Sequence, residues 1–422
     1  MTSRLAWLRA QVTSRFWFRV SLYGLLAVLA ALLAALIAPW VPETLTERIA
    51  DGTAREILKI LASTMLVVAT FSLGTMVQAF GSAASLATPR ATRVLIDDPF
   101  SQRVLSTFLG AFVFSIVGLF AQSFGYYSHA GDAVMLLAAG LVIALVLTTL
   151  FSWLDHLANM VRLGDIISKV ETRAEDVLRK RARAPRMGGV AMADAPPLNW
   201  TIAADGTAYV RHLDMAALQD IAVTAGGIIE VKCAPGAITD VTRPLARTSW
   251  EASETDADAI RDAFTTGRER SLEEDPRYCL QVVAEISSRA LSPGINDPGT
   301  AIAIVAAQQR LLTAWAKERA AHEPADITCD RVIAPGLTPD DLFEDAFAPL
   351  LRDAAANVEV GLRLQKSLQA LARLGQPGYA DAAATTSGKA LRHAARALAL
   401  SEDHDRLAEA ASGLATDHSP CD

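Results

Sequence analysis

Cysteine is scarce in this sequence, and the few cysteines stand too far apart to act together. The chain of 422 residues has four, namely Cys233, Cys279, Cys329 and Cys421. Zinc sites and the disulfide frameworks of small secreted domains need short, paired cysteine spacings, which are absent here. Neither kind of site is therefore expected, and the cysteine usage fits a reducing compartment.

Charged residues are also few, and their scarcity excludes an intrinsically disordered chain. They make up 20% of the sequence, whereas hydrophobic residues make up 51%. Up to Arg186 there are 18 Lys and Arg against 12 Asp and Glu (+6), and after it 21 against 34 (−13). A basic apolar part followed by an acidic part is typical of a membrane region joined to a water-exposed domain, and it argues against nucleic-acid binding.

Catalytic motifs are missing as well. The seven histidines have no metal-ligand spacing, and no nucleophile elbow, phosphate-binding loop or zincin motif occurs. Glu273, Glu274, Asp275, Asn296 and Asp297 would offer oxygen ligands to a divalent cation if the fold gathered them, but a hydrated acidic surface is the favoured interpretation. We therefore expect no enzyme, no bound metal and no cofactor.

Long apolar runs are abundant in the first part of the chain. A helix needs about 20 apolar residues to cross the roughly 30 Å hydrocarbon core of a bilayer. The first run follows basic residues, as a secretory signal does, but its length favours an uncleaved anchor. We expect four transmembrane helices within residues 1–160, and they are Val20–Pro42, Ile60–Pro89, Val104–Gly131 and Ala133–Leu154.

The basic residues near the span ends predict the orientation, because Lys and Arg are retained on the cytoplasmic side. Four arginines and no acidic residue precede the first span, between Arg4 and Arg19. Eight Lys and Arg follow the fourth span, between Arg162 and Arg186. Both termini are therefore expected in the cytoplasm.

The second span has two chemically different faces. Projected at 100° per residue, one stripe consists of small and polar residues, which are Ser63, Thr70, Gly74, Gln78, Gly81 and Ser85. The other side is apolar and is expected to meet lipid, with Leu66, Ala69, Leu73, Met76, Val77 and Phe80. The stripe is predicted either to pack on other helices or to line a pore narrowed at Gln78, and packing explains most such faces.

The rest of the chain is expected to form a cytoplasmic α+β part. Residues 161–197 read as a charged helix and linker, residues 198–252 as a small β-barrel-like module, and residues 253–422 as a helical bundle. Lys232 falls inside an expected strand, which argues against a lipoyl or biotin carrier with its lysine at a hairpin tip. The expected strands are Tyr209–Leu213, Ile228–Cys233, Ala237–Val241 and Leu245–Ser249, around a helix at Met215–Ala225.

Capping residues mark the expected bundle helices. Two of these helices begin at Pro298, after Asp297, and at Pro339, after Thr338. The expected helices include Asp256–Thr266, Pro276–Leu291, a helix from Pro298, Pro339–Leu374, and a last helix capped by Ser401.

Two stretches carry a resemblance to a known family. They are Ser-Leu-Ala-Thr-Pro-Arg at residues 85–90 and Arg-Ala-Leu-Ser-Pro-Gly-Ile-Asn-Asp-Pro-Gly-Thr-Ala at residues 289–301. With the four spans, they resemble the bacterial predicted membrane proteins called domain of unknown function 2254. The resemblance implies a bacterial inner-membrane location and no known activity. In the second stretch we expect a structural turn formed by Ser292, Pro293, Asn296, Asp297 and Pro298, where capping is favoured over anion binding.

The functional expectation is a homo-oligomeric, channel-like assembly in the lipid bilayer with a cytoplasmic regulatory domain. The alternative is a membrane-anchored scaffold or sensor that recruits a cytoplasmic protein partner and transports nothing. An axis lined by the second span would explain its polar stripe, whereas the absence of charge inside every span gives no sign of an ion pathway.

Overall fold

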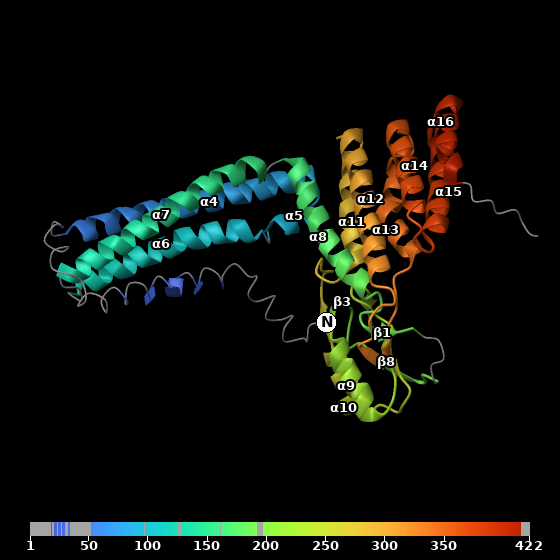
Figure 1. The fold of residues 1–422 in the computed structure, drawn as a ribbon, viewed down its shortest axis with the longest axis horizontal. Coiled ribbons are helices and arrows are strands. Elements are labelled where there is room, and N and C mark those ends of the chain that lie inside the picture. Colours follow the sequence, from blue (N-terminus) through green and yellow to red (C-terminus); the bar gives the residue numbers. More distant parts are fainter. Residues whose placement is uncertain are drawn as a thin grey trace, which may run out of the picture. The chain divides into compact units, whose positions relative to one another are not determined.

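The computed structural model describes residues 52–96, 98–124, 129–160, 162–191 and 197–414, with scattered positions between 18 and 33. The chain divides into two compact units at Ile166 and Ile167. We call the part up to Ile166 the N-terminal unit and the part from Ile167 the C-terminal unit, and each is described by itself (Figure 1).

Four helices of the N-terminal unit lie between residues 53 and 160, and three of them are long and apolar enough to cross a membrane. The three candidate spans are Thr53–Ser85, Phe100–Ser123 and Asp132–Leu157. The expected first span, Val20–Pro42, lies largely outside the described residues. The helices are α4 (Thr53–Leu86), α5 (Pro89–Ile96), α6 (Pro99–Ser123) and α7 (His129–Met160).

The helix α4 is longer than a single crossing needs. It begins at Thr53, before the expected Ile60, so that its first turns carry Arg55, Glu56 and Lys59. At 1.5 Å per residue its 34 residues extend over about 51 Å, against about 30 Å of hydrocarbon. The helix ends before Pro89, where α5 begins after a short break, and the Thr88 hydroxyl accepts a hydrogen bond from the Ala91 N–H (3.1 Å).

The core of the N-terminal unit lies where α4, α6 and α7 pack together (Figure 1). Phe108 of α6 and Met135 of α7 are fully buried there, together with Leu58 of α4. A methyl group on Gly118 of α6 would lie 2.3 Å from the end of the Met135 side chain, so α6 and α7 approach closely at this glycine and Met135 would have to move. The packing uses one side of α4 and leaves its other side exposed.

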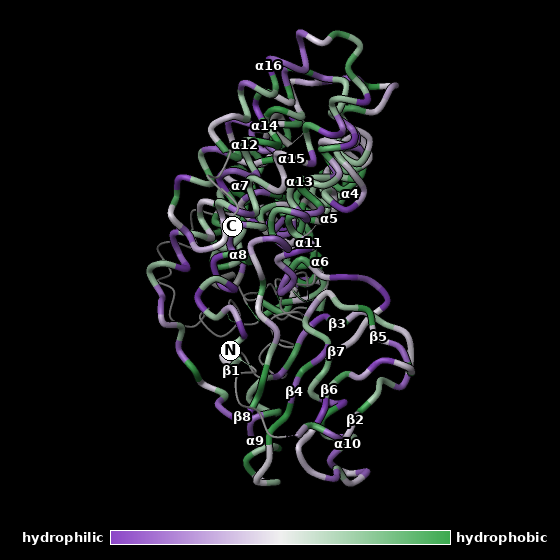
Figure 2. The backbone as a smooth tube through the Cα atoms, turned by 90° about the vertical axis from the view of Figure 1, so that its right-hand side faces the viewer, coloured by the Kyte–Doolittle hydropathy of each residue, from purple (hydrophilic) through white to green (hydrophobic). Residues whose placement is uncertain are grey.

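The C-terminal unit contains two sheets (Figure 2). In the larger sheet, β8 runs parallel to its neighbours β1 and β4, and the other pairs are antiparallel. Its order is β1 (Gly189–Val190), β8 (Cys329–Ile333), β4 (Ile229–Val231), β6 (Pro244–Thr248) and β2 (Trp200–Ala203). The smaller sheet is antiparallel, in the order β5 (Ile238–Thr239), β3 (Ala208–Leu213) and β7 (Phe264–Gly267).

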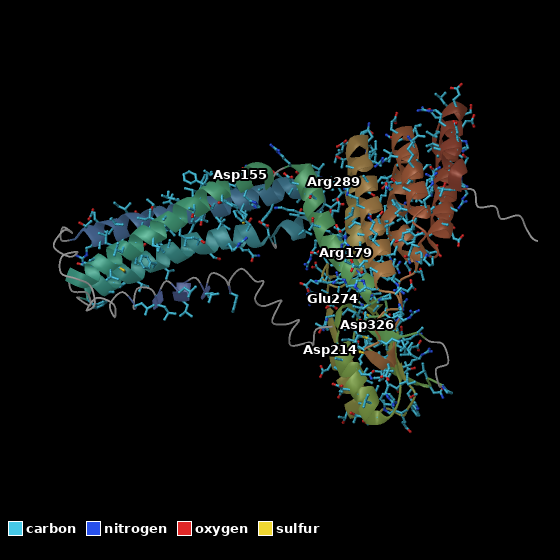
Figure 3. All side chains as sticks on the ribbon, in the orientation of Figure 1. Asp155, Arg179, Asp214, Glu274, Arg289 and Asp326 are labelled. Carbon is cyan, nitrogen blue, oxygen red and sulfur yellow. The ribbon has the colours of Figure 1, made fainter. Side chains whose placement is uncertain are left out.

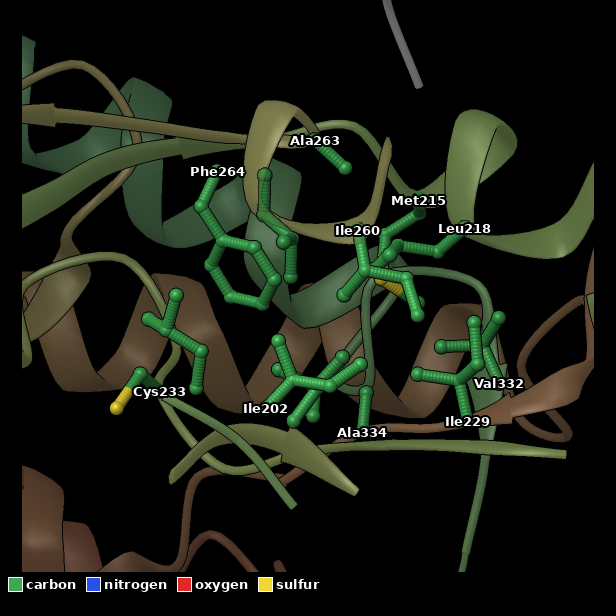
Figure 4. Close-up of a cluster of buried hydrophobic side chains, with 14 of the residues drawn as sticks. Ile202, Met215, Leu218, Ile229, Cys233, Ile260, Ala263, Phe264, Val332 and Ala334 are labelled. Atoms are coloured by element: carbon green, nitrogen blue, oxygen red, sulfur yellow. The ribbon is translucent and has the colours of Figure 1, made fainter. Parts of the chain in front are cut away.

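The expected β-barrel does not form, since no barrel closes among the described strands. Two strands that we did not expect, β7 and β8, come from beyond residue 252 and complete the sheets. The expected helix Asp256–Thr266 is only α10 (Glu254–Asp262), because the following residues pair with β3. Together with α9 (Met215–Ala225), the strands enclose a core that includes Leu218, Ile229 and Val332 (Figure 4).

Helices form the rest of the C-terminal unit. The expected single helix Pro339–Leu374 is two helices, because the chain breaks after Asp353 and Asn357 caps the second by accepting a hydrogen bond from the Val360 N–H (3.1 Å). Leu400, and not Ser401, occupies the cap position of the last α-helix. The helices are α8 (Leu163–Arg183), α11 (Pro276–Ala290), α12 (Pro298–Ala321), α13 (Pro339–Asp353), α14 (Val358–Ala372), α15 (Tyr379–Ala397) and α16 (Ser401–Ala411), followed by a 3-10 turn (Ser412–Leu414).

Removing the Phe347 ring should strongly destabilise the helical part of the C-terminal unit. Phe347 is fully buried and packs edge-on against Phe343. We expect Phe347→Ala to lower the free energy of unfolding by about 3–5 kcal/mol, because truncation leaves a cavity. Urea denaturation, monitored by hydrogen exchange of the backbone amides in α13 and α15, would measure this loss of stability. Leu374→Ala is the control, since Leu374 is exposed, and an equal loss in both variants would contradict the packing described here.

Candidate functional site

The polar stripe of α4 lies on the exposed side of the helix. Its members are Ser63, Thr70, Gly74, Gln78, Gly81 and Ser85, and all six are exposed. The buried residues of α4, such as Leu61 and Met65, lie on the opposite side and pack on the neighbouring helices. The stripe therefore faces away from α6 and α7.

The prediction that the apolar side of α4 meets lipid is only partly correct. Leu66, Leu73 and Val77 are exposed, as expected. Ala69, however, is buried in the core of the unit, and Met76 and Phe80 pack against that core. The exposed surface of α4 therefore carries the polar stripe and large apolar side chains together.

The stripe hydroxyls bond to their own helix. Ser63 donates to the Ile60 carbonyl (3.0 Å), Thr70 to the Leu66 carbonyl (2.8 Å) and Ser85 to the Ser82 carbonyl (2.7 Å). These hydroxyls therefore need neither water nor another helix as a hydrogen-bond partner. The Gln78 carboxamide differs, because it makes no hydrogen bond to any described residue.

The family motif forms a capped connection between α11 and α12. The Asp297 carboxylate accepts hydrogen bonds from the Thr300 N–H (3.0 Å) and hydroxyl (2.6 Å), and these bonds lower the pKa of Asp297. Pro298 is the first helical residue, and Asn296 has a positive φ of 49°. Ser292, next to Pro293, donates from its hydroxyl to the Arg289 carbonyl (2.7 Å). The Asp297 side chain thus already occupies the helix N-terminus where an anion would bind.

The acidic residues proposed as cation ligands are not gathered. Asp275 caps the N-terminus of α11, whereas Asn296 and Asp297 follow its C-terminus, about 22 Å away along a helix of 15 residues. Glu274 (Figure 3) pairs with His212 at 2.8 Å. Within the described ranges, no three His, Cys, Asp or Glu residues are close enough to hold a metal ion.

Sequence reasoning missed a cavity in the C-terminal unit. Its volume is about 420 Å³, and it lies beyond the carboxyl ends of the parallel strands β4 and β8. The triplet Ala234-Pro235-Gly236 follows β4, and Ala334-Pro335-Gly336 follows β8. Both Pro-Gly pairs line the cavity, and the repeated Ala-Pro-Gly is the sequence signal that could have pointed to it. Parallel strands bring loops of this kind to one sheet edge, where ligands commonly bind.

Charged residues from four chain segments line this cavity. Four are cationic, namely Arg181, Lys232, Arg270 and Arg277, and two are acidic, namely Asp275 and Asp341. Both carboxylates are paired, Asp275 with Arg270 (2.7 Å) and Asp341 with Arg277 (2.9 Å). Lys232 pairs with Glu230 (2.9 Å), which does not line the cavity.

Arg181 differs from the other three cations. It is only 8% exposed, and its guanidinium donates a hydrogen bond to the Glu274 carbonyl oxygen (3.1 Å). No described carboxylate lies within ion-pair distance of it. Burial lowers the pKa of Arg181, against the opposing influence of Glu274 and Asp275.

Asp275 joins the cavity wall to the adjoining helix. It is 2% exposed, and it accepts hydrogen bonds from the Arg270 guanidinium (2.7 Å) and the Tyr278 N–H (3.0 Å). Burial raises the pKa of Asp275, and Arg270 opposes that rise. Arg270 also lies over the Tyr278 ring, 4.7 Å from its centroid. Gly236 leaves room for this carboxylate, because a methyl group there would lie 2.1 Å from Asp275 Oδ2.

Adding that methyl group should disturb the first Ala-Pro-Gly loop. Gly236 has φ of +95°, so Gly236→Ala combines a strained backbone with a clash against a carboxylate held by two hydrogen bonds. We expect a loss of about 2 kcal/mol or more in the free energy of unfolding. Faster hydrogen exchange in residues 232–238 would report it.

Gly336→Ala is the matched control from the second loop. A methyl group there would meet only the Arg186 side chain, at 3.7 Å, and Gly336 has no positive φ. We expect a change within about 0.5 kcal/mol. Equal stability of the two variants would contradict the loop geometry.

Comparison with known proteins agrees with the resemblance in the motif. Uncharacterized proteins of Mycobacterium bovis and Mycobacterium tuberculosis are 26% identical to this chain over an alignment of 333 positions, which covers 71% of the chain and 56% of each relative. The chain thus spans about half the length of these relatives. No solved structure matches it. A family model described as a predicted membrane protein matches residues 13–370, and the chain therefore belongs to the family called domain of unknown function 2254.

Proposed function

We propose that this membrane protein forms a homo-oligomeric, channel-like assembly in which the exposed polar stripes of several α4 helices face a shared axis. The observation that supports it is the position of Gln78. Its carboxamide lies in the second half of the charge-free run Ile60–Pro89, on the exposed side of α4, without a partner among the described residues. The C-terminal unit would regulate this assembly.

The free energy of burying an unpaired carboxamide explains why the position of Gln78 supports the proposal. A carboxamide without a hydrogen-bond partner in hydrocarbon costs several kcal/mol, so a second Gln78 or water in a central passage would stabilise it. Gly74 and Gly81, one turn to either side, have open space where a methyl group would stand. A neighbouring helix can approach closely at such glycines.

A second candidate function is a membrane-anchored sensor or scaffold that recruits a cytoplasmic partner and transports nothing. Two observations favour it. The stripe hydroxyls of Ser63, Thr70 and Ser85 are satisfied by their own helix and do not need water. The C-terminal unit also carries a formed cavity lined by charged residues. In both candidate functions the protein catalyses no reaction.

For the orientation, we propose that both termini lie in the cytoplasm of a bacterial cell and that the spans cross its inner membrane. Arg90, Arg93 and Arg103 stand between the second and third expected spans, whereas no Lys or Arg stands between the third and fourth. Basic connections stay on the cytoplasmic side. The relatives from mycobacteria support a bacterial setting.

Cysteine labelling tests this orientation. In a variant without native cysteines, a membrane-impermeant maleimide should label His129→Cys in intact cells, because His129 begins α7 on the proposed outer side. Ser412→Cys, in the 3-10 turn after α16, should be labelled only after permeabilisation. Labelling of Ser412→Cys in intact cells would overturn the orientation.

The channel-like assembly is tested by Gln78→Leu. The purified protein in liposomes should give ion or solute flux and should cross-link as an oligomer. We expect Gln78→Leu to reduce the flux by about tenfold or more, because an interhelical amide contact contributes on the order of 1–2 kcal/mol.

Leu73→Ala is the matched control for this experiment. Leu73 is exposed on the apolar side of α4 and does not belong to the stripe, so its change should leave flux and oligomer unchanged. Absence of flux from the wild-type protein, or a monomer in mild detergent, would contradict the channel and favour the sensor or scaffold.

A further inference from the structure

The charges around the 420 Å³ cavity of the C-terminal unit do not balance along its wall. Four cations line it, against the two carboxylates of Asp275 and Asp341. Each of these carboxylates already forms an ion pair with an arginine of the same wall. Lys232 pairs with Glu230, which lines the adjoining cavity, so Arg181 carries the positive charge that no described carboxylate pairs.

Arg181 is the least compensated of these groups. An arginine that is only 8% exposed normally has a carboxylate partner, because an unpaired buried charge costs several kcal/mol. Arg181 has only the Glu274 carbonyl among its described hydrogen-bond partners, although a guanidinium offers five N–H donors. An anion in the cavity would supply the missing partner.

Backbone donors lie along the same wall. The N–H groups of Gly336 and Leu337, in the loop after β8, make no hydrogen bond to another described residue. Both residues line the cavity. Unpaired backbone N–H groups beside cationic side chains are suited to oxyanions.

We propose that this cavity binds a small phosphorylated molecule, with its phosphoryl group against Arg181 and Lys232. A guanidinium fork matches phosphate geometry, and lysine binds phosphate as a point charge. The inference does not depend on the channel-like assembly, because it concerns residues of the C-terminal unit alone.

The size and the remaining walls favour a molecule larger than phosphate itself. A volume of about 420 Å³ is in the range of small-molecule sites and exceeds the need of one tetrahedral ion. Pro235, Pro335 and Leu337 supply apolar wall that an organic group would contact. The ligand class is therefore a sugar phosphate or a nucleotide.

Calorimetric titration of the full-length protein in detergent tests the proposal. The probes are pyrophosphate, ribose phosphate and adenosine monophosphate, with ribose and adenosine as uncharged counterparts. We expect at least one phosphorylated probe to bind and its uncharged counterpart to give no heat. Arg181→Gln should weaken that binding by about tenfold or more, since hydrogen bonds to charged groups contribute on this scale. Arg181→Lys should also weaken it, because the fork is lost.

Two further variants control for folding and for position. Lys232→Gln changes a side chain that is 36% exposed but pairs with the buried Glu230, so its fold is checked by circular dichroism, and the folded variant should weaken binding by about tenfold. Arg183→Gln, on the same helix as Arg181, removes an exposed guanidinium that pairs with Glu318 outside the cavity, and its affinity should stay within about twofold of wild type.

Each outcome either supports or overturns the proposal. Weakened binding in Lys232→Gln and in a folded Arg181→Gln, with Arg183→Gln unchanged, supports the proposal. Absence of heat with all three phosphorylated probes overturns it, and so does binding that neither Arg181→Gln nor Lys232→Gln weakens. None of these results bears on flux, so failure here leaves the membrane proposal untouched.

Discussion

The parallel pairing of β4 with β8 holds the C-terminal unit together. Ile229 pairs with Val332 and Glu230 with Ile333, across a separation of about 100 residues. Ile229 and Val332 are fully buried in the core between the sheets and α9. Because parallel strands run in the same direction, the loops that follow them leave the sheet at one edge. The cavity, its two Pro-Gly pairs and Lys232 all owe their positions to this pairing.

In the N-terminal unit the governing constraint is the hydrogen bonding of polar groups in hydrocarbon. Helices satisfy their own backbone groups, which is why the spans are helical. Ser63 and Thr70 extend this rule to side chains, because each hydroxyl donates to a carbonyl three or four residues earlier. A hydroxyl on a lipid-facing helix is thereby tolerated, but a carboxamide such as that of Gln78 cannot be satisfied in the same way. Among the polar groups of the stripe, only the Gln78 carboxamide therefore indicates that this face of α4 needs a partner.

The sequence predicted best those features that depend on residues close together in the chain. Run length and lack of charge located α4, α6 and α7, and Asp297 with Pro298 located the start of α12. Its predictions failed for features that depend on contacts between segments far apart in the chain. The barrel was wrong because β8 joins β4 from far along the chain, and the break before Asn357 was missed because apolar periodicity continues across it. Polarity alone also misassigned Ala69, since the choice of buried face depends on which helices are neighbours.

The cavity was missed for the same reason, since Arg181, Lys232 and Arg270 are far apart in the sequence. Asp275 shows how the fold sets the charge of the cavity wall. One carboxylate caps α11, pairs with Arg270 and occupies the space that Gly236 leaves open. Left unpaired, this buried anion would repel an oxyanion in the cavity, but its ion pair with Arg270 largely cancels its charge. Because Lys232 is paired with Glu230, the field that a bound anion experiences then comes chiefly from Arg181, and the strength of the site depends on keeping Asp275 and Arg270 together.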